Sequence, residues 1–201
     1  MTRLLFFLTA IALSSGAPTE TASGNEQPPT PVINVAENQY LIEFEDFAAD
    51  QGWDNPGRVP QRSAASNGES LHLFKDESIT VVFCLPIEQD VFIRNVFFSN
   101  DGWVDDIKVD LDGVEVGEFR SADESQWGYL WNSFNFTGSV GEITNLISGR
   151  HELTFTVVDG DEWGVELDAI KLEFSRPDLT VDLKCPEGEE YIIEGEGVVE
   201  V

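Results

Sequence analysis

Two carboxylates stand where a buried apolar stripe should run, in the stretch 164–174. With the period of two that a β-strand has, Glu166 and Asp168 share a face with Ile170, which should enter the core. The neighbouring Lys171 points to the opposite face and cannot meet them. An ionised carboxylate in a core is costly unless it is paired or coordinates a metal, so this strand needs a positive partner.

A second stretch, 41–45, has the same feature, because Glu43 and Glu45 lie two residues apart on one side of a short strand. If the first and last strands are neighbours, Glu43, Glu45 and Asp168 converge, with Glu166 as a further candidate and no cation in the sequence to meet them. Such a set of oxygen ligands predicts a hard divalent ion, calcium. Two other interpretations stay open: a solvated acidic strand end, and a glycosidase with paired carboxylates. A short chain with its acids on strands has little room for a catalytic cleft, so we expect no enzyme.

Tryptophans supply the other candidate chemistry. Trp53, Trp103 and Trp163 each stand in an acidic turn that contains glycine. The C–H face of a sugar ring stacks on an exposed indole, while its hydroxyls donate to nearby carboxylates and amides. The sequence therefore predicts a glycan contact through Trp103 and Trp163, then Trp53, with hydrogen bonds from Asn100 and Asp161. The alternative for each tryptophan is that it caps the edge of the core.

The remaining candidates favour packing over chemistry. Trp127 and Trp131 lie in or beside an expected strand, where core or inter-sheet packing is the simpler interpretation. His151 starts a strand on its inward side and is expected to be a packed edge residue. The sequence contains no recognisable Ser-His-Asp spacing, zinc-ligand cluster or phosphate-binding glycine loop, so no catalytic residues are proposed.

The order of these motifs resembles carbohydrate-binding modules of families 6 and 35. The Glu-x-Glu first strand and the Gly-x-x-Leu-Asp-x-Ile-x-Leu last strand carry the resemblance, together with the stretches 91–100 and 148–155. It extends from Asn38 to Ser175. The resemblance implies a jelly-roll β-sandwich with a structural calcium, whose ligands match Glu43, Glu45 and Asp168 in position. It also implies a sugar site on the loop rim.

One feature departs from the resembled modules. Their ligand lies between aromatic residues near an asparagine close to the last strand, and Trp163 stands about where that asparagine is expected. The polar contact would have to come from Asn100 or Asp161. The resemblance therefore does not transfer a sugar specificity to this sequence.

Short alternating strands separated by turns predict an all-β protein, a two-sheet antiparallel jelly-roll β-sandwich of the galactose-binding-domain-like type. Asp112-Gly113 is typical of a tight hairpin turn. The alternation of Leu130, Phe134 and Phe136 with Trp131 and Ser133 predicts a further strand there. The predicted organisation is a signal peptide over 1–17, a disordered linker over 18–36, the sandwich over 37–175 and an acidic extension over 176–201 that packs as a hairpin.

Composition limits the partners. The chain has 38 acidic and 11 basic residues and a formal charge of −27. Such a surface repels nucleic acid and anionic membranes and favours cations. The sequence therefore leaves a rival function open, an acidic calcium-binding structural or interaction protein of an extracellular matrix or mineral surface.

The two cysteines and the N-terminus indicate secretion. Arg3 and the apolar run that follows are typical of a signal peptide. Cys84 has the opposite parity to the inward-facing Phe83, so an outward cysteine and the tail cysteine, Cys185, are expected to form a disulfide in an oxidising compartment. Asn135-Phe136-Thr137 is a glycosylation sequon that matters only in a eukaryotic host.

Overall fold

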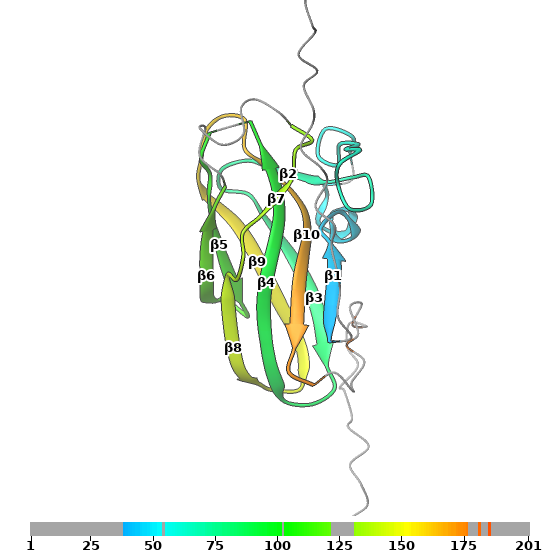
Figure 1. Cartoon of the computed structure of the whole chain (residues 1–201), viewed down its shortest axis with the longest axis vertical. Coiled ribbons are helices and arrows are strands. Elements are labelled where there is room, and N and C mark those ends of the chain that lie inside the picture. Colours follow the sequence, from blue (N-terminus) through cyan, green and yellow to red (C-terminus); the bar gives the residue numbers. More distant parts are fainter. Residues whose placement is uncertain are drawn as a thin grey trace, which may run out of the picture.

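The computed structural model describes residues 38–53, 55–101, 103–121, 131–176, 181 and 185 of the chain. Two antiparallel sheets lie face to face and form a β-sandwich (Figure 1). In these residues the only helical elements are two 3₁₀ turns, η1 (Glu45–Phe47) and η2 (Ala49–Gln51), which follow the first strand. The predicted all-β, two-sheet sandwich is confirmed.

The larger sheet has six strands and is built around its last one. β10 lies between β1 and β4, β2 pairs with the start of β10, and β7 and β8 both pair with β4. The first and last strands are therefore neighbours, as the sequence analysis required. The strands are β1 (Gln39–Glu43), β2 (Leu71–Leu73), β4 (Gln89–Asn100), β7 (Asn135–Phe136), β8 (Gly141–Leu146) and β10 (Val165–Phe174).

The smaller sheet has the order β3-β9-β5-β6. Asp112 and Gly113, which join β5 to β6, have φ angles of 49° and 79°. Positive φ at both central residues is the geometry of the hairpin turn that this dipeptide predicts. The strands are β3 (Ser78–Leu85), β5 (Asp106–Leu111), β6 (Val114–Arg120) and β9 (Gly149–Asp159).

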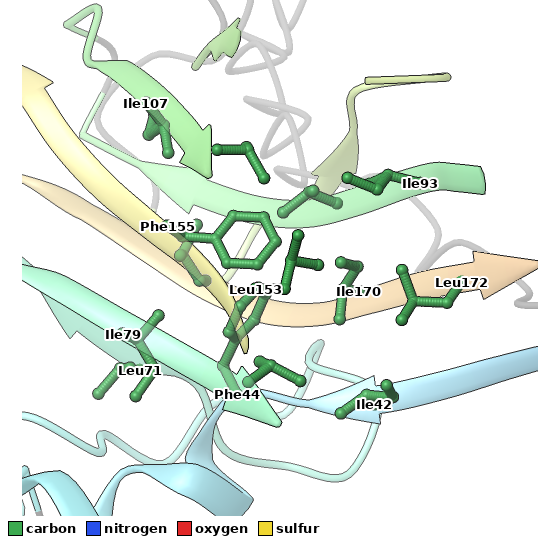
Figure 2. Packing of buried hydrophobic residues seen from close by; sticks show 14 of the residues in the cluster. Ile42, Phe44, Leu71, Ile79, Ile93, Ile107, Leu153, Phe155, Ile170 and Leu172 are labelled. Carbon is green, nitrogen blue, oxygen red and sulfur yellow. The ribbon is translucent and has the colours of Figure 1, made fainter. Parts of the chain in front are cut away.

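The core fills the space between the sheets (Figure 2). Phe44 and Phe155 meet edge to face at its centre, with ring centroids 5.0 Å apart. Ile170 and Leu172 of β10 and Ile93 of β4 are fully buried. Burial of each such side chain contributes about 1.5–3 kcal/mol, so this core holds the two sheets together.

The alternation predicted for β10 is only partly correct. All six residues from Val165 to Ile170 are buried. The register against β4 shifts between Leu167 and Ile170, so that both side chains join the core although they are three residues apart. Leu167 and Ala169 are therefore as buried as Ile170, although simple parity assigns them to the opposite face. The bulge changes which side chains this strand aims at its neighbours.

The predicted strand around 130–136 is also shorter than expected. Only Asn135 and Phe136 form β7, and Trp131 and Asn132 lie in a turn in which Asn132 has a φ of 75°. Leu130 lies outside the described residues. Phe136, expected inward, is half exposed. Asn132-Ser133, directly after Trp131, is typical of a turn. The prediction of a strand gave more weight to the alternating aromatic residues than to this turn signal.

The Cys84–Cys185 disulfide is confirmed, with Cα atoms 5.6 Å apart. Val181 is buried as well, and its N–H donates to the Tyr40 hydroxyl at 3.3 Å. The predicted signal peptide and linker, and most of the predicted C-terminal hairpin, lie outside the described residues. Among the residues that are described, no helix is long and apolar enough to cross a membrane.

Candidate functional site

The pairing of β1 with β10 brings acidic residues together. Glu43 lies opposite Ala169, and the Phe44 N–H donates to the Asp168 carbonyl at 3.1 Å. The Ser66 hydroxyl lies 2.5 Å from a Glu43 oxygen and 2.9 Å from an Asp168 oxygen. Because a hydroxyl carries one proton, it can donate to only one of the two carboxylates at a time.

Glu45 does not lie on β1, which corrects the expectation from the sequence. The strand ends at Glu43, and Glu45 opens η1. Its carboxylate is nevertheless affected by the other two acids, because Glu43 and Asp168 both raise the pKa of Glu45 after burial has done so. Both of its carboxylate oxygens are buried, and neither has a hydrogen-bond partner elsewhere in the described residues.

We call Glu43, Glu45 and Asp168 the carboxylate cluster. Burial is the first cause of a raised pKa in all three. Repulsion by nearby acids adds to it: Glu43 acts on both Glu45 and Asp168, and Asp46 acts on Glu43. The pKa of Glu45 reaches about 8 and that of Asp168 about 7. Without a positive partner, the cluster therefore holds protons near neutral pH that free carboxylates would release.

Oxygen atoms also line the space beside the cluster. Glu45 borders a pocket of about 410 Å³ that Asn55, Gln61 and Glu69 also line. Within the part of the chain that the structure describes, no three His, Cys, Asp or Glu side chains are already placed as a set of metal ligands. The donors fit a hard cation in type, and the unsatisfied oxygens of Glu45 are the atoms that need one.

Glu166 has a cation, which corrects the expectation that none was available. The guanidinium of Arg62 pairs with both of its carboxylate oxygens, with Nε to Oε2 at 2.7 Å. Ser70 Oγ also donates to Oε2, at 3.2 Å. Arg62 comes from the loop before β2, which has no periodicity from which a contact could be predicted. Glu166 therefore belongs to a buried ion pair and not to the carboxylate cluster.

A second acidic region lies at the loop rim, where two similar turns meet. Asp101 follows β4 and Asp161 precedes β10, and the two strands are paired there through Asn100 and Val165. In each turn the aspartate Oδ1 accepts the backbone N–H of the tryptophan two residues later, at 3.0 Å for Trp103 and 2.7 Å for Trp163. The two loops therefore lie side by side at this rim.

The tryptophans of the two turns line one pocket. Trp103 and Trp163 are 51% and 56% exposed, and with Asp101 and Trp131 they surround a volume of about 340 Å³. We call these four residues the tryptophan pocket. Trp131 is the residue that the sequence analysis missed, having assigned it to strand packing; its ring lies against His72, with centroids 5.1 Å apart.

Acidic groups continue beneath the pocket. Asp105 is 1% exposed and its Oδ1 has no hydrogen-bond partner in the described residues, while Ser121 Oγ donates to Oδ2 at 3.2 Å. Burial first, then Asp161 and Asp101, raise the pKa of Asp105 to about 7. Burial and then Asp161 likewise raise the pKa of Asp101. A Cβ at Gly160 would lie 2.2 Å from Asp105 Oδ1, so any larger residue there would have to displace the Asp105 carboxylate.

The other two predicted contact residues have structural positions. Asn100 is buried, and its side-chain amide donates to the Trp103 carbonyl and to Ser121 Oγ, so it supports the pocket from below. Trp53 is not among the residues that line the pocket. It packs against the core, and the Arg58 guanidinium lies 4.6 Å from its ring centroid.

Comparison with known proteins assigns the architecture to a class. No protein-family model matches the sequence, and no curated protein sequence matches it. Solved structures that resemble it include carbohydrate-binding modules, so the resemblance inferred from the sequence is confirmed at the level of the fold. All those described next share less than a fifth of their residues with this chain, and the likeness therefore concerns the fold alone.

Three such structures can be named. A GH26-CBM35 β-(1,4)-mannanase of Podospora anserina has a TM-score of 0.50 and 14% identity, and the match covers 71% of this chain and 29% of that one. The C-terminal CBM6 of a Zobellia galactanivorans laminarinase has a TM-score of 0.46, 15% identity and coverages of 68% and 99%. The CBM6cm-2 module of Cellvibrio mixtus lichenase 5A, solved with cellotriose, has a TM-score of 0.47, 12% identity and coverages of 67% and 95%.

Proposed function

We propose that this protein is a non-catalytic glycan-binding module whose sugar site is the tryptophan pocket. The observation that carries the proposal is the convergence of three tryptophans and a carboxylate on one solvent-facing pocket. An indole held in a hydrophilic rim must meet a partner or leave apolar surface in water. The fold likeness to carbohydrate-binding modules supports a carbohydrate as that partner.

The pocket is organised before a ligand arrives. The N–H groups of Trp103 and Trp163 are tied to Asp101 and Asp161, and Asn100 holds the Trp103 carbonyl. Little loop ordering is then required on binding, which favours affinity. The C–H face of a sugar ring stacks on the indoles, and its hydroxyls donate to the carboxylate oxygens that remain free.

We propose that calcium stabilises the fold at the carboxylate cluster. Glu43, Glu45 and Asp168 would hold the ion, which would supply the positive charge that the buried oxygens of Glu45 lack. Bound there, it would connect β1, η1 and β10. The Cys84–Cys185 disulfide and the signal-peptide pattern of residues 1–17 support secretion into an oxidising, extracellular compartment, where calcium is available.

The test is a glycan array followed by titration calorimetry with the best ligand. Trp103→Ala and Trp163→Ala should each weaken binding about thirtyfold, the typical cost of about 2 kcal/mol for an aromatic hot spot. Phe136→Ala is the matched control, because Phe136 is 52% exposed but lies outside the pocket. Unchanged affinity in both tryptophan variants would refute the proposed site.

The net charge of −27 favours a second candidate, an acidic protein that binds many calcium ions on a matrix or mineral surface. Equilibrium dialysis with calcium distinguishes the two. One tight ion together with a glycan signal supports the module, whereas uptake of many weakly held ions with an empty array supports the surface protein.

A further inference from the structure

Apart from the indole N–H groups, the polar side-chain groups at the tryptophan pocket are acidic. Among the described residues, Asp101 is the only side chain other than the tryptophans that lines it, and Asp161 lies close enough to raise the pKa of Asp101. Carboxylates accept hydrogen bonds and do not donate them when ionised. The neighbouring amide, Asn100, is buried and already donates to Trp103 and Ser121. The pocket therefore offers aromatic faces and negative acceptors to its ligand.

Two nearby cations in the described part of the chain are already paired with acids. Lys75 pairs with Asp159 at 2.7 Å, and Arg120 pairs with Asp106 at 2.6 Å. The carboxylates of Asp101, Asp105 and Asp161 meanwhile repel one another. A ligand that brings a positive charge to the pocket would relieve this repulsion, whereas a neutral sugar would leave it in place.

Resting on the proposed function, we propose that the tryptophan pocket selects a cationic glycan, with the free ammonium of an amino sugar seated against Trp103, Trp131 and Trp163 and facing Asp101 and Asp161. Tryptophan is the aromatic residue that attracts cations most strongly, and an ammonium group donates three hydrogen bonds and accepts none. Aromatic faces beside carboxylates match both properties. The large negative charge of the chain adds long-range attraction for a polycation.

A matched series of β-1,4-linked hexasaccharides tests the proposal. The glucosamine, N-acetylglucosamine and glucose forms differ only at carbon 2, and a galactosamine oligosaccharide tests the ring configuration. In a buffer that keeps the amines protonated, we expect the mature protein to bind an amino form at least about tenfold more tightly than its uncharged counterparts. Added salt should reduce this preference, because the attraction is electrostatic.

Two isosteric variants locate the effect. Asp101→Asn and Asp161→Asn keep an Oδ1 acceptor for the tryptophan N–H, and either should lower the preference for the amino form over the neutral form about tenfold. Glu88→Gln is the charge control, because Glu88 is exposed in the turn before β4, whereas the rim follows the other end of that strand. Melting curves verify that each variant is folded. If one of the two variants is unfolded, the other still tests the proposal.

The outcomes separate this inference from the proposed function. If all forms bind equally, or if an acetylated or neutral form binds best, the proposal of a cationic ligand is wrong. If Trp103→Ala then abolishes that binding, the proposed glycan-binding function still stands. A third outcome is that a neutral glycan binds, but that EDTA and the Asp161→Asn variant each abolish this binding. Such a result would place a metal ion at the rim and would likewise overturn the inference. If no glycan binds at all, both the inference and the function fall.

Discussion

The carboxylate cluster and the tryptophan pocket both gather acids beside the start of β10, yet their surroundings differ. The pockets beside them have similar volumes, about 410 and 340 Å³. Oxygen-bearing side chains and small aliphatic groups line the first, and indole rings line the second. The first is bordered by a carboxylate that has no hydrogen-bond partner among the described residues, and the second presents aromatic faces to water. Similar charge and size therefore suit a bare ion in one region and a ring-sized ligand in the other.

A third acid on the same strand shows what a partner changes. Glu166 and Asp168 are two residues apart and both buried, but Arg62 neutralises only Glu166. The pKa of Asp168 is raised to about 7, mainly by burial. Position on β10 therefore does not decide whether an acid is neutralised. The loop that contacts the acid decides it, by supplying or not supplying a cation.

The largest effect should come from making Glu166 resemble the carboxylate cluster. Arg62→Met leaves a fully buried carboxylate without its cation, so we expect a loss of about 3–5 kcal/mol in the free energy of unfolding. Urea unfolding followed by tryptophan fluorescence measures it. The double variant Arg62→Met, Glu166→Gln should recover most of the loss. A single variant as stable as the wild type would show that an unpaired acid here costs little, and would weaken the case for an ion at Glu45.

The next effect concerns the acid beneath the rim. Because the folded pKa of Asp105 is about 7 and its ordinary value is 3.8, the unfolded chain releases this proton at lower pH than the folded chain does. The contribution of Asp105 to stability should therefore be greatest below about pH 4 and fall until about pH 7, by up to about 4 kcal/mol. Asp105→Asn keeps the shape, removes this contribution to the fall and should be more stable than the wild type at neutral pH.

Urea unfolding of both proteins across this pH range, in EDTA, isolates the contribution of Asp105 as a difference between them. Glu45 and Asp168 also have raised pKa values, and their contribution is common to both proteins and cancels. Glu88→Gln, which changes an exposed acid, should follow the wild type. If the wild type and Asp105→Asn have parallel pH profiles, Asp105 is not held protonated by its site.

Much of this comparison was predictable from the sequence, for a physical reason. Strand periodicity predicts the elements, whereas the resemblance to known modules implied that the Trp103 and Trp163 loops share a rim and that Glu43 lies near Asp168; the first, fourth and last strands do share a sheet. The disulfide followed from the outward parity of Cys84 and is present. Local patterns predict the strands and the face that each side chain takes, but the order of strands in the sheets had to come from the resemblance.

Irregular segments account for what the sequence analysis missed. Arg62 and Ser66 come from a loop with no periodic pattern, and they decide the partners of Glu166 and Asp168. The bulge in β10 and the left-handed Asn132 interrupt patterns that otherwise predict simple strands. Trp131 reaches the pocket because its segment turns instead of extending. Tertiary contacts of loops are not encoded in hydrophobic alternation.

Calcium should distinguish the two acidic regions by stability. At a hundredfold excess over its dissociation constant, the ion should stabilise the wild type by about 2.7 kcal/mol, because it binds only the folded state. Asp168→Asn should lose this response, and Asp161→Asn at the rim should keep it. Differential scanning calorimetry with calcium or EDTA measures both. A wild type that melts identically in the two conditions, or an Asp168→Asn variant that still responds, would remove the ion from the carboxylate cluster.

The smallest expected effect is the one that tests the separation of the two regions. Asn100, Asp101 and Asp161 hold the tryptophan turns through hydrogen bonds that do not involve the carboxylate cluster. Removal of calcium, at a temperature where the metal-free protein stays folded, should therefore change glycan affinity by less than about twofold, or about 0.4 kcal/mol. Calorimetric titration in EDTA measures this, with circular dichroism as the check on folding. A large loss of affinity that Asp168→Asn does not reproduce would mean that a cation acts at the rim itself, and the two regions would then share one chemistry.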